Sequence, residues 1–192
     1  MNLRTDFRLL LVILLLASAA SLGQAQRSSQ RINGTVVGIS GRFAGRSRPF
    51  SLIVNNYTSP SQIAELNEAR QRGEDELLQA LSRMNAGRIQ VGTGLGVTAN
   101  AIIATPWEGG TKITVLYKRN VNFYELRYGT RSSDYRFGYA ELFLDRNGKG
   151  EGTFIPAARV SLKNGNQWEV EDFGVFPARL LGLTSSGHVV PS

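Results

Sequence analysis

One stretch of the sequence places a carboxylate among aromatic side chains. If residues 135–144 form a strand, alternation puts Glu141 on a mostly aromatic face. The aromatic residues on that face are Tyr135, Phe137, Tyr139 and Phe143. The opposite face is also apolar, so we expect a strand that is buried on both sides. Glu141 should then be paired or protonated, because an unpaired charge in an apolar setting is very unfavourable.

We expect Glu141 to pair with an arginine. Arg127 and Arg131 are the leading candidates because they are close in the sequence, and Arg179 is a further one. The carboxylates of Glu125 and Asp134 would complete the network. Two interpretations stay open: an internal salt bridge that fixes strand register, or a polar focus in a barrel mouth that binds a small ligand.

A second group of acids raises the possibility of hydrolysis. Glu169, Glu171 and Asp172 lie on or next to one strand. A glycosidase needs two carboxylates about 5–9.5 Å apart, and one of these acids could form such a pair with Glu141. Alternation puts Glu169 and Glu171 on one face, which we expect to point to water. No residue marks a nucleophile, so a hydrolase is the alternative and not the main interpretation.

Several other chemistries lack the residues they require. The chain has no cysteine and one histidine, His188, which removes thiolate sites and multi-histidine metal sites. Asp145 begins a calcium-like loop, but Lys149 and Pro156 occupy ligand positions, so we expect a hairpin turn. The glycines of 92–96 precede a strand pattern and not a helix, which argues against a phosphate loop. We therefore expect no metal and no cofactor.

The charge of the chain is +7, carried mostly by arginine. Arg42, Arg46 and Arg48 cluster at the tip of an expected hairpin. They could contact an anionic component of the cell envelope, or only protect the exposed edges of a β protein. A single-strand nucleic-acid platform needs aromatic residues among the basic ones, and here only Phe43 and Phe50 stand near them, so we expect no nucleic-acid partner.

The elements that carry these residues begin with a hairpin and a helical pair. Residues 35–43 and 50–54 alternate as two strands. Ser59, Pro60 and Gln62 form a strong helix start with a capping box. Gly73 ends this helix, and a second one follows to about residue 85. We expect this helical hairpin, at about 60–85, to plug or cap one end of a barrel.

From residue 88 onward the sequence is almost entirely strand-like. The expected strands are 88–92, 97–105, 112–118, 123–127, 135–144, 152–162, 168–173 and 178–183. Glycine-containing turns separate several of them. The sequence thus predicts an α+β, mainly β fold: an antiparallel barrel or sandwich of about ten strands with an inserted helical hairpin.

Several phrases resemble a widespread family of small exported bacterial proteins with no assigned function. The phrases are residues 74–81, 131–137, 145–152, 169–174 and 177–180, within a resemblance that covers residues 59–183. Where the family pattern has a proline, this chain has Arg136. The resemblance implies export and a single domain, and it assigns no catalytic residue.

The first 25 residues have the pattern of a secretory signal peptide. Arg4 and Arg8 precede an apolar run, 9–20, and residues 23–25 fit a small-x-small cleavage site. An uncleaved membrane anchor is the alternative. We expect a signal peptide over 1–25, one β-rich domain over 26–184 and a flexible tail over 185–192, with no membrane span in the mature chain. The predicted function is an exported, non-catalytic binding or structural domain, periplasmic or extracellular.

Overall fold

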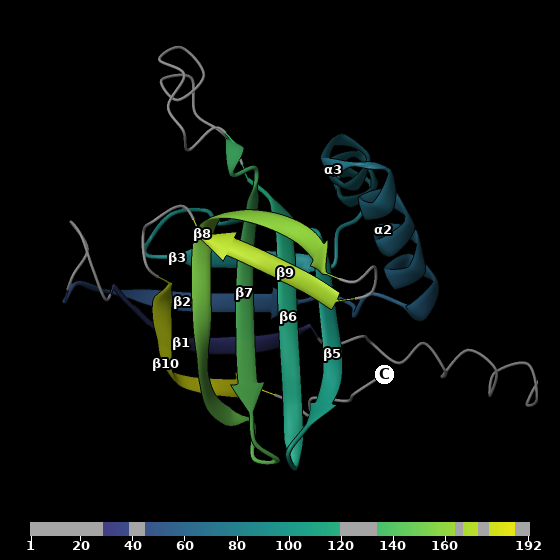
Figure 1. Ribbon diagram of the computed structural model, residues 1–192. Helices are drawn as coiled ribbons and strands as arrows, with labels where there is room; N and C mark the ends of the chain where they lie inside the picture. The colour runs from purple at the N-terminus through teal and green to yellow at the C-terminus, as the bar shows by residue number, and fades with distance from the viewer. Residues whose placement is uncertain (1–28, 39–44, 120–133, 164–166, 173–176, 187–192) are drawn as a thin grey trace, which may run out of the picture.

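The computed structural model describes residues 29–38, 45–119, 134–163, 167–172 and 177–186. Within these residues lie ten strands and two helices (Figure 1). In chain order they are β1 (Gln30–Val37), β2 (Ser47–Val54), α2 (Pro60–Arg72), α3 (Glu74–Ser82), β3 (Gly87–Val91), β4 (Val97–Ala99), β5 (Ala101–Trp107), β6 (Gly110–Lys118), β7 (Phe137–Leu144), β8 (Lys149–Lys163), β9 (Gln167–Asp172) and β10 (Ala178–Ser186). The prediction of a mainly β fold with an inserted helical hairpin is confirmed.

The strands form one antiparallel sheet that curls into a nearly closed barrel. The order is β4-β3-β2-β1-β10-β8-β7-β6-β5, and β9 pairs with β8. In Figure 1 strands β1, β2 and β3 run across the view behind strands β5, β6 and β7, which run along it, and β8 and β10 bend between the two sets. Of the two predicted architectures, the structure is therefore the barrel.

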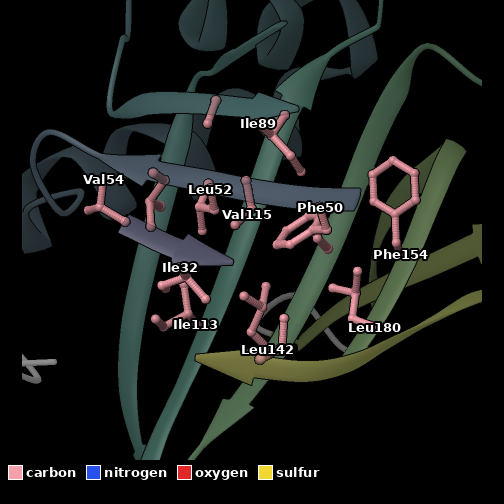
Figure 2. Packing of buried hydrophobic residues seen from close by; sticks show 14 of the residues in the cluster. Ile32, Phe50, Leu52, Val54, Ile89, Ile113, Val115, Leu142, Phe154 and Leu180 are labelled. Carbon is pink, nitrogen blue, oxygen red and sulfur yellow. The ribbon is translucent and has the colours of Figure 1, made fainter. Parts of the chain in front are cut away.

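The interior of the barrel is filled by aliphatic and aromatic side chains. Ile32, Phe50 and Leu52 from one set of strands meet Ile113 and Leu142 from the other (Figure 2). All five are at most 2% exposed. Such close packing of apolar surface is the main favourable contribution to folding, and it leaves the interior occupied by side chains.

A second apolar cluster lies on the outer face of β5 to β8. It joins Leu66 and Ala69 of α2 and Leu77 and Leu81 of α3 to sheet residues that point outward, such as Leu116. The end of β8 and its partner β9 fold over the same face, where Val160 is buried. The expectation that the helices plug or cap the barrel is therefore wrong: they pack against its outside wall (Figure 1).

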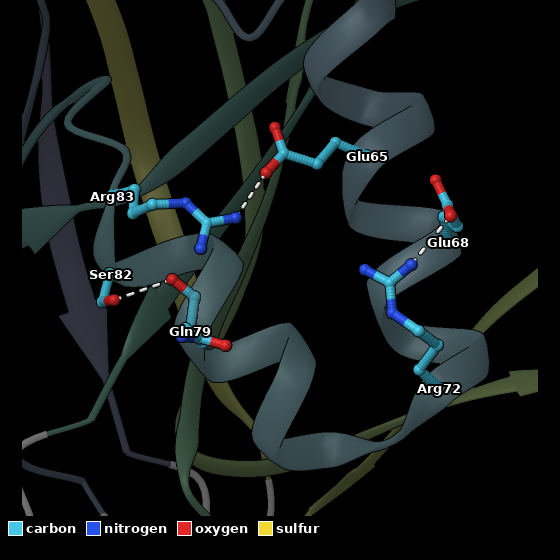
Figure 3. A network of polar contacts seen from close by, with 6 residues as sticks. All are labelled: Glu65, Glu68, Arg72, Gln79, Ser82 and Arg83. Carbon is cyan, nitrogen blue, oxygen red and sulfur yellow. Dashed lines mark hydrogen bonds and ion pairs between the residues drawn. The ribbon is translucent and has the colours of Figure 1, made fainter.

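The helical hairpin forms where its local signals predicted it. Ser59 accepts a hydrogen bond from the Gln62 backbone N–H, and the Gln62 side chain accepts one from the Ser59 N–H, which completes the capping box. Exposed ion pairs, Glu68–Arg72 and Glu65–Arg83, decorate the outer side (Figure 3). Each is worth at most about 1 kcal/mol, so the buried face of the hairpin holds it in place.

The barrel closes at a corner that divides one predicted strand in two. Residues 97–105 were expected as a single strand, but the chain turns at Asn100 between β4 and β5. The Asn100 amide donates to the carbonyls of Leu81 (2.9 Å) and Met84 (3.1 Å), and its oxygen accepts from the Lys118 N–H at 2.8 Å. At the end of β6 the Asn100 side chain therefore accepts the hydrogen bond from the Lys118 N–H that the backbone carbonyl of a neighbouring strand would otherwise accept.

The free edge of β5 is covered by the loop before α2. The Thr58 N–H donates to the Ile102 carbonyl at 2.8 Å, and the Thr58 hydroxyl accepts from the Ile102 N–H at 2.9 Å. Thr58 and Asn100 are both buried. Unpaired edge groups invite pairing with other chains; Thr58 satisfies both backbone groups of Ile102, and Asn100 satisfies the N–H of Lys118.

Other boundaries agree with the predicted turns. Glu108 and Gly109 have φ of 28° and 84° and form the two-residue connection between β5 and β6. Strand β10 extends through Ser186, so Ser185 and Ser186 pair with β1 and are not a tail. The predicted strand 123–127 and the signal peptide lie outside the described residues. In the described part of the chain, no helix has the length and apolarity that a membrane span requires.

Candidate functional site

Glu141 lies on the outer face of β7 and not in the barrel interior. Its neighbours Ala140, Leu142 and Leu144 belong to the inner cluster, so alternation turns Glu141 outward. Its side chain is 26% exposed. The prediction of a fully internal carboxylate is wrong because the aliphatic face, and not the aromatic one, faces the barrel core.

The described partners of Glu141 are a lysine and a tyrosine. The Lys112 ammonium lies 3.3 Å from the carboxylate, and the Tyr139 hydroxyl donates to it at 3.0 Å. Burial, reinforced by the charge of Glu141, raises the pKa of Tyr139 above its ordinary value, so this phenol stays protonated as a donor. The arrangement links side chains of β6 and β7, with a lysine in place of the expected arginine among the described partners.

Two of the expected site residues share the outer face but do not touch. In register, Glu141 pairs with Thr153 of β8, and Thr153 pairs with Arg179 of β10. Arg179 forms its own exposed ion pair with Glu151 at 3.0 Å. Asp134 is exposed, just before β7. Glu125, Arg127 and Arg131 lie outside the described residues.

An aromatic pair lies beside the polar side chains of Glu141, Thr153 and Arg179 on the outer face. The rings of Trp107 and Phe143 are 4.7 Å apart and inclined by 58°. Trp107 remains 41% exposed at the end of β5. In the part of the chain that the structure describes, the outer face therefore offers ion pairs, hydroxyl groups and the exposed indole of Trp107, a composition suited to surface contact.

The other candidate carboxylates serve local structure. Glu169 and Glu171 are exposed on β9, as predicted, and Glu171 accepts a hydrogen bond from Tyr135 at 2.9 Å. Asp145 accepts from the N–H groups of Asn147 and Lys149, which confirms the predicted hairpin turn. Among the described residues, no three His, Cys, Asp or Glu side chains gather as metal ligands.

A shallow polar cavity of about 330 Å³ opens beside the seam of the barrel, where the two ends of the sheet, β4 and β5, meet at Asn100. We call it the seam cavity. Its lining comes from the end of α3, the β3–β4 region and the end of β6. The residues are Ser82, Arg88, Gly96, Val97, Thr98, Asn100 and Lys118. Two of them are cationic and none is acidic, so the cavity suits an anionic group.

Sequence reasoning did not select this cavity, although a signal for it was present. Residues 77–107 contain Arg83 and Arg88 but no Asp or Glu. The signal was masked because Lys118 is distant in sequence and meets Arg88 only when the barrel closes at Asn100. The register pairs Arg88 directly with Thr98, which brings a hydroxyl to the same place.

Comparison with known proteins adds no relative to this description. No family model matches the chain, and neither a curated protein nor a solved structure matches it.

Proposed function

We propose that this protein is an exported, non-catalytic β-domain that binds a component of the cell envelope through its outer surface. The observation that supports the proposal is the filled barrel interior. Side chains such as Phe50, Ile113 and Leu142 occupy the volume in which other barrels hold a small ligand. Any contact with the envelope component would then be made by the outer surface of the barrel.

The placement of the carboxylates also favours binding over hydrolysis. A glycosidase holds two carboxylates around a substrate cleft. Glu141 is engaged by Lys112 and Tyr139 on an outer face, and no carboxylate lines the seam cavity. No contact of the described acids favours the hydrolase alternative.

The proposed location follows from the leader pattern of residues 1–25, which is typical of a cleaved signal peptide. The charge of +7 suits partners with anionic groups, which envelopes supply as phosphates and carboxylates. A mixed surface with a basic excess binds such partners more weakly as salt rises.

The test is sedimentation of the purified protein with isolated envelopes of its host. We expect the protein to sediment with the envelopes at low salt, to be released by high salt, and to liberate no soluble reducing sugar. Release of sugar above the protein-free control would favour the hydrolase, and a protein that stays in the supernatant would contradict binding.

A further inference from the structure

The turn between β3 and β4 carries an apolar side chain that the fold leaves uncovered. Leu95 is 90% exposed, and Val91, at the start of the turn, is 37% exposed. Together with Trp107 these are the exposed large apolar residues of the described chain. Leu95 is therefore a separate feature that the barrel core does not explain.

The backbone holds this turn in a defined shape. The Gly92 N–H donates to the Pro49 carbonyl at 2.8 Å, and the Arg88 guanidinium donates to the Leu95 carbonyl at 3.0 Å. Gly92 and Gly96 adopt φ of 76° and 75°, values that other residues rarely take. Leu95 is thus presented by a fixed tip.

Two cations, Arg48 and Arg88, lie at the tip, and the strands behind it carry no acid. Strands β1 to β4 contain Arg31, Arg48 and Arg88 but neither Asp nor Glu. The Arg48 side chain comes within 4.0 Å of the Cβ position at Gly92, and Arg46 is exposed just before β2. This wall of the barrel presents positive charge only.

The seam cavity lies behind the same turn and adds the Lys118 ammonium and the Thr98 hydroxyl to the groups near it. Arg88 and Lys118 line it together with Gly96 of the turn itself and the Thr98 hydroxyl. Guanidinium, ammonium and hydroxyl donors are the groups that hold phosphate oxygens. Leu95 and this donor set are linked physically, because Arg88 contacts both the turn and the cavity.

We propose that the β3–β4 turn is a membrane-contact tip for an anionic phospholipid surface. Leu95 and Val91 enter the interfacial layer, while the seam cavity and Arg48 take headgroup phosphates. Apolar anchors combined with flanking cations are what binding to an anionic leaflet requires. The proposal deepens the proposed function by naming the envelope component as lipid.

The experiment is flotation of the protein, purified from its host, with vesicles of phosphatidylcholine alone or with added phosphatidylglycerol. We expect binding only when phosphatidylglycerol is present. Leu95→Ser should weaken it at least about tenfold, since the anchor is lost. Leu95 is almost fully exposed, so this change leaves the fold intact.

The cationic part has a charge-matched control. Arg48→Gln with Lys118→Gln should weaken vesicle binding about 25-fold, at about fivefold for each cation near the surface, and it keeps the Arg88 bond that shapes the turn. Arg72→Gln with Lys149→Gln removes the same charge from exposed positions outside the tip and should retain most of the binding.

Three results would overturn the proposal. These are wild-type protein that does not float with phosphatidylglycerol vesicles, Leu95→Ser protein that binds as wild type does, and saturation by free inorganic phosphate with no preference for vesicles. The last outcome would assign the cavity to a soluble anion. Any of them leaves sedimentation with whole envelopes untouched, so failure here is distinguishable from failure of the proposed function.

Discussion

Replacing Asn100 by alanine is expected to lower the free energy of unfolding by about 3 kcal/mol. The side chain makes three hydrogen bonds, to the Leu81 and Met84 carbonyls and from the Lys118 N–H. Each such bond contributes about 1 kcal/mol net to stability. The substitution also leaves two carbonyls and one N–H buried without a partner, which is unfavourable because they have lost their contact with water. For a chain of 192 residues the melting temperature should fall by about 6–12 °C.

An isosteric substitution sharpens this prediction. Asn100→Asp keeps the acceptor for Lys118 but turns a carboxylate toward two carbonyl oxygens. Burial and those oxygens raise the pKa of the introduced carboxyl in the folded state, so the unfolded state releases its proton first. The variant, compared with wild type at the same pH, should therefore recover stability as pH falls through that raised pKa.

The assay is urea unfolding of both variants, with Asn85→Ala as the control from the exposed loop after α3. Equal m-values are needed for a fair comparison of midpoints. If Asn100→Ala unfolds within about 0.5 kcal/mol of wild type, the range of ordinary surface substitutions, the side chain does not close the barrel.

Four further outcomes are expected. Gly138→Ala should destabilise the protein by about 1–3 kcal/mol or more, because a Cβ there would lie 1.9 Å from the Tyr117 ring. The control, Gly94→Ala, has open space around it and should be neutral or slightly stabilising in the same unfolding assay. Glu141→Ala should cost only about 1–2 kcal/mol, as a partly exposed ion pair with one charged hydrogen bond; a loss above about 3 kcal/mol would restore the buried interpretation. Burial raises the pKa of Tyr117 and Tyr139, so the free energy of unfolding should be highest below pH 10 and fall above it by at most about 1.4 kcal/mol per pH unit for each tyrosine. Unfolding followed together with phenolate absorbance measures this, and an unchanged free energy of unfolding at pH 11 would contradict it. Excess EDTA should leave the melting temperature unchanged, and a clear drop would reveal a bound ion.

Local signals in the sequence were sufficient for the helices and tight turns. The capping box at Ser59 and the Glu108–Gly109 turn depend on residues within a few positions, so they could be predicted without knowledge of the fold. Gly73 likewise separates the two helices as expected.

The corner at Asn100 could not be predicted in this way. Apolar residues lie on both sides of Asn100, from Val97 to Ala104, so residues 97–105 resemble one continuous strand. Asn100 is identified only by partners on α3 and β6 that are distant in sequence. The same limit applies to the seam cavity, which exists because that corner brings Arg88 and Lys118 together.

The position of Glu141 was misjudged for a related reason. Both faces of β7 are apolar, because α2, α3 and the end of β8 cover part of the outer wall. Sequence alternation then separates the two faces but does not say which is inside. Small and aliphatic residues, Ala140 and Leu142, fill the interior, and the face that carries the carboxylate turns outward.

The most direct test of the central claim is the intact mass and cellular location of the protein recovered from its host. An exported binding domain predicts a single species in the envelope or secreted fraction, beginning near Gln26. Recovery of the full-length chain, beginning at Met1, from the cytoplasmic fraction would contradict the account.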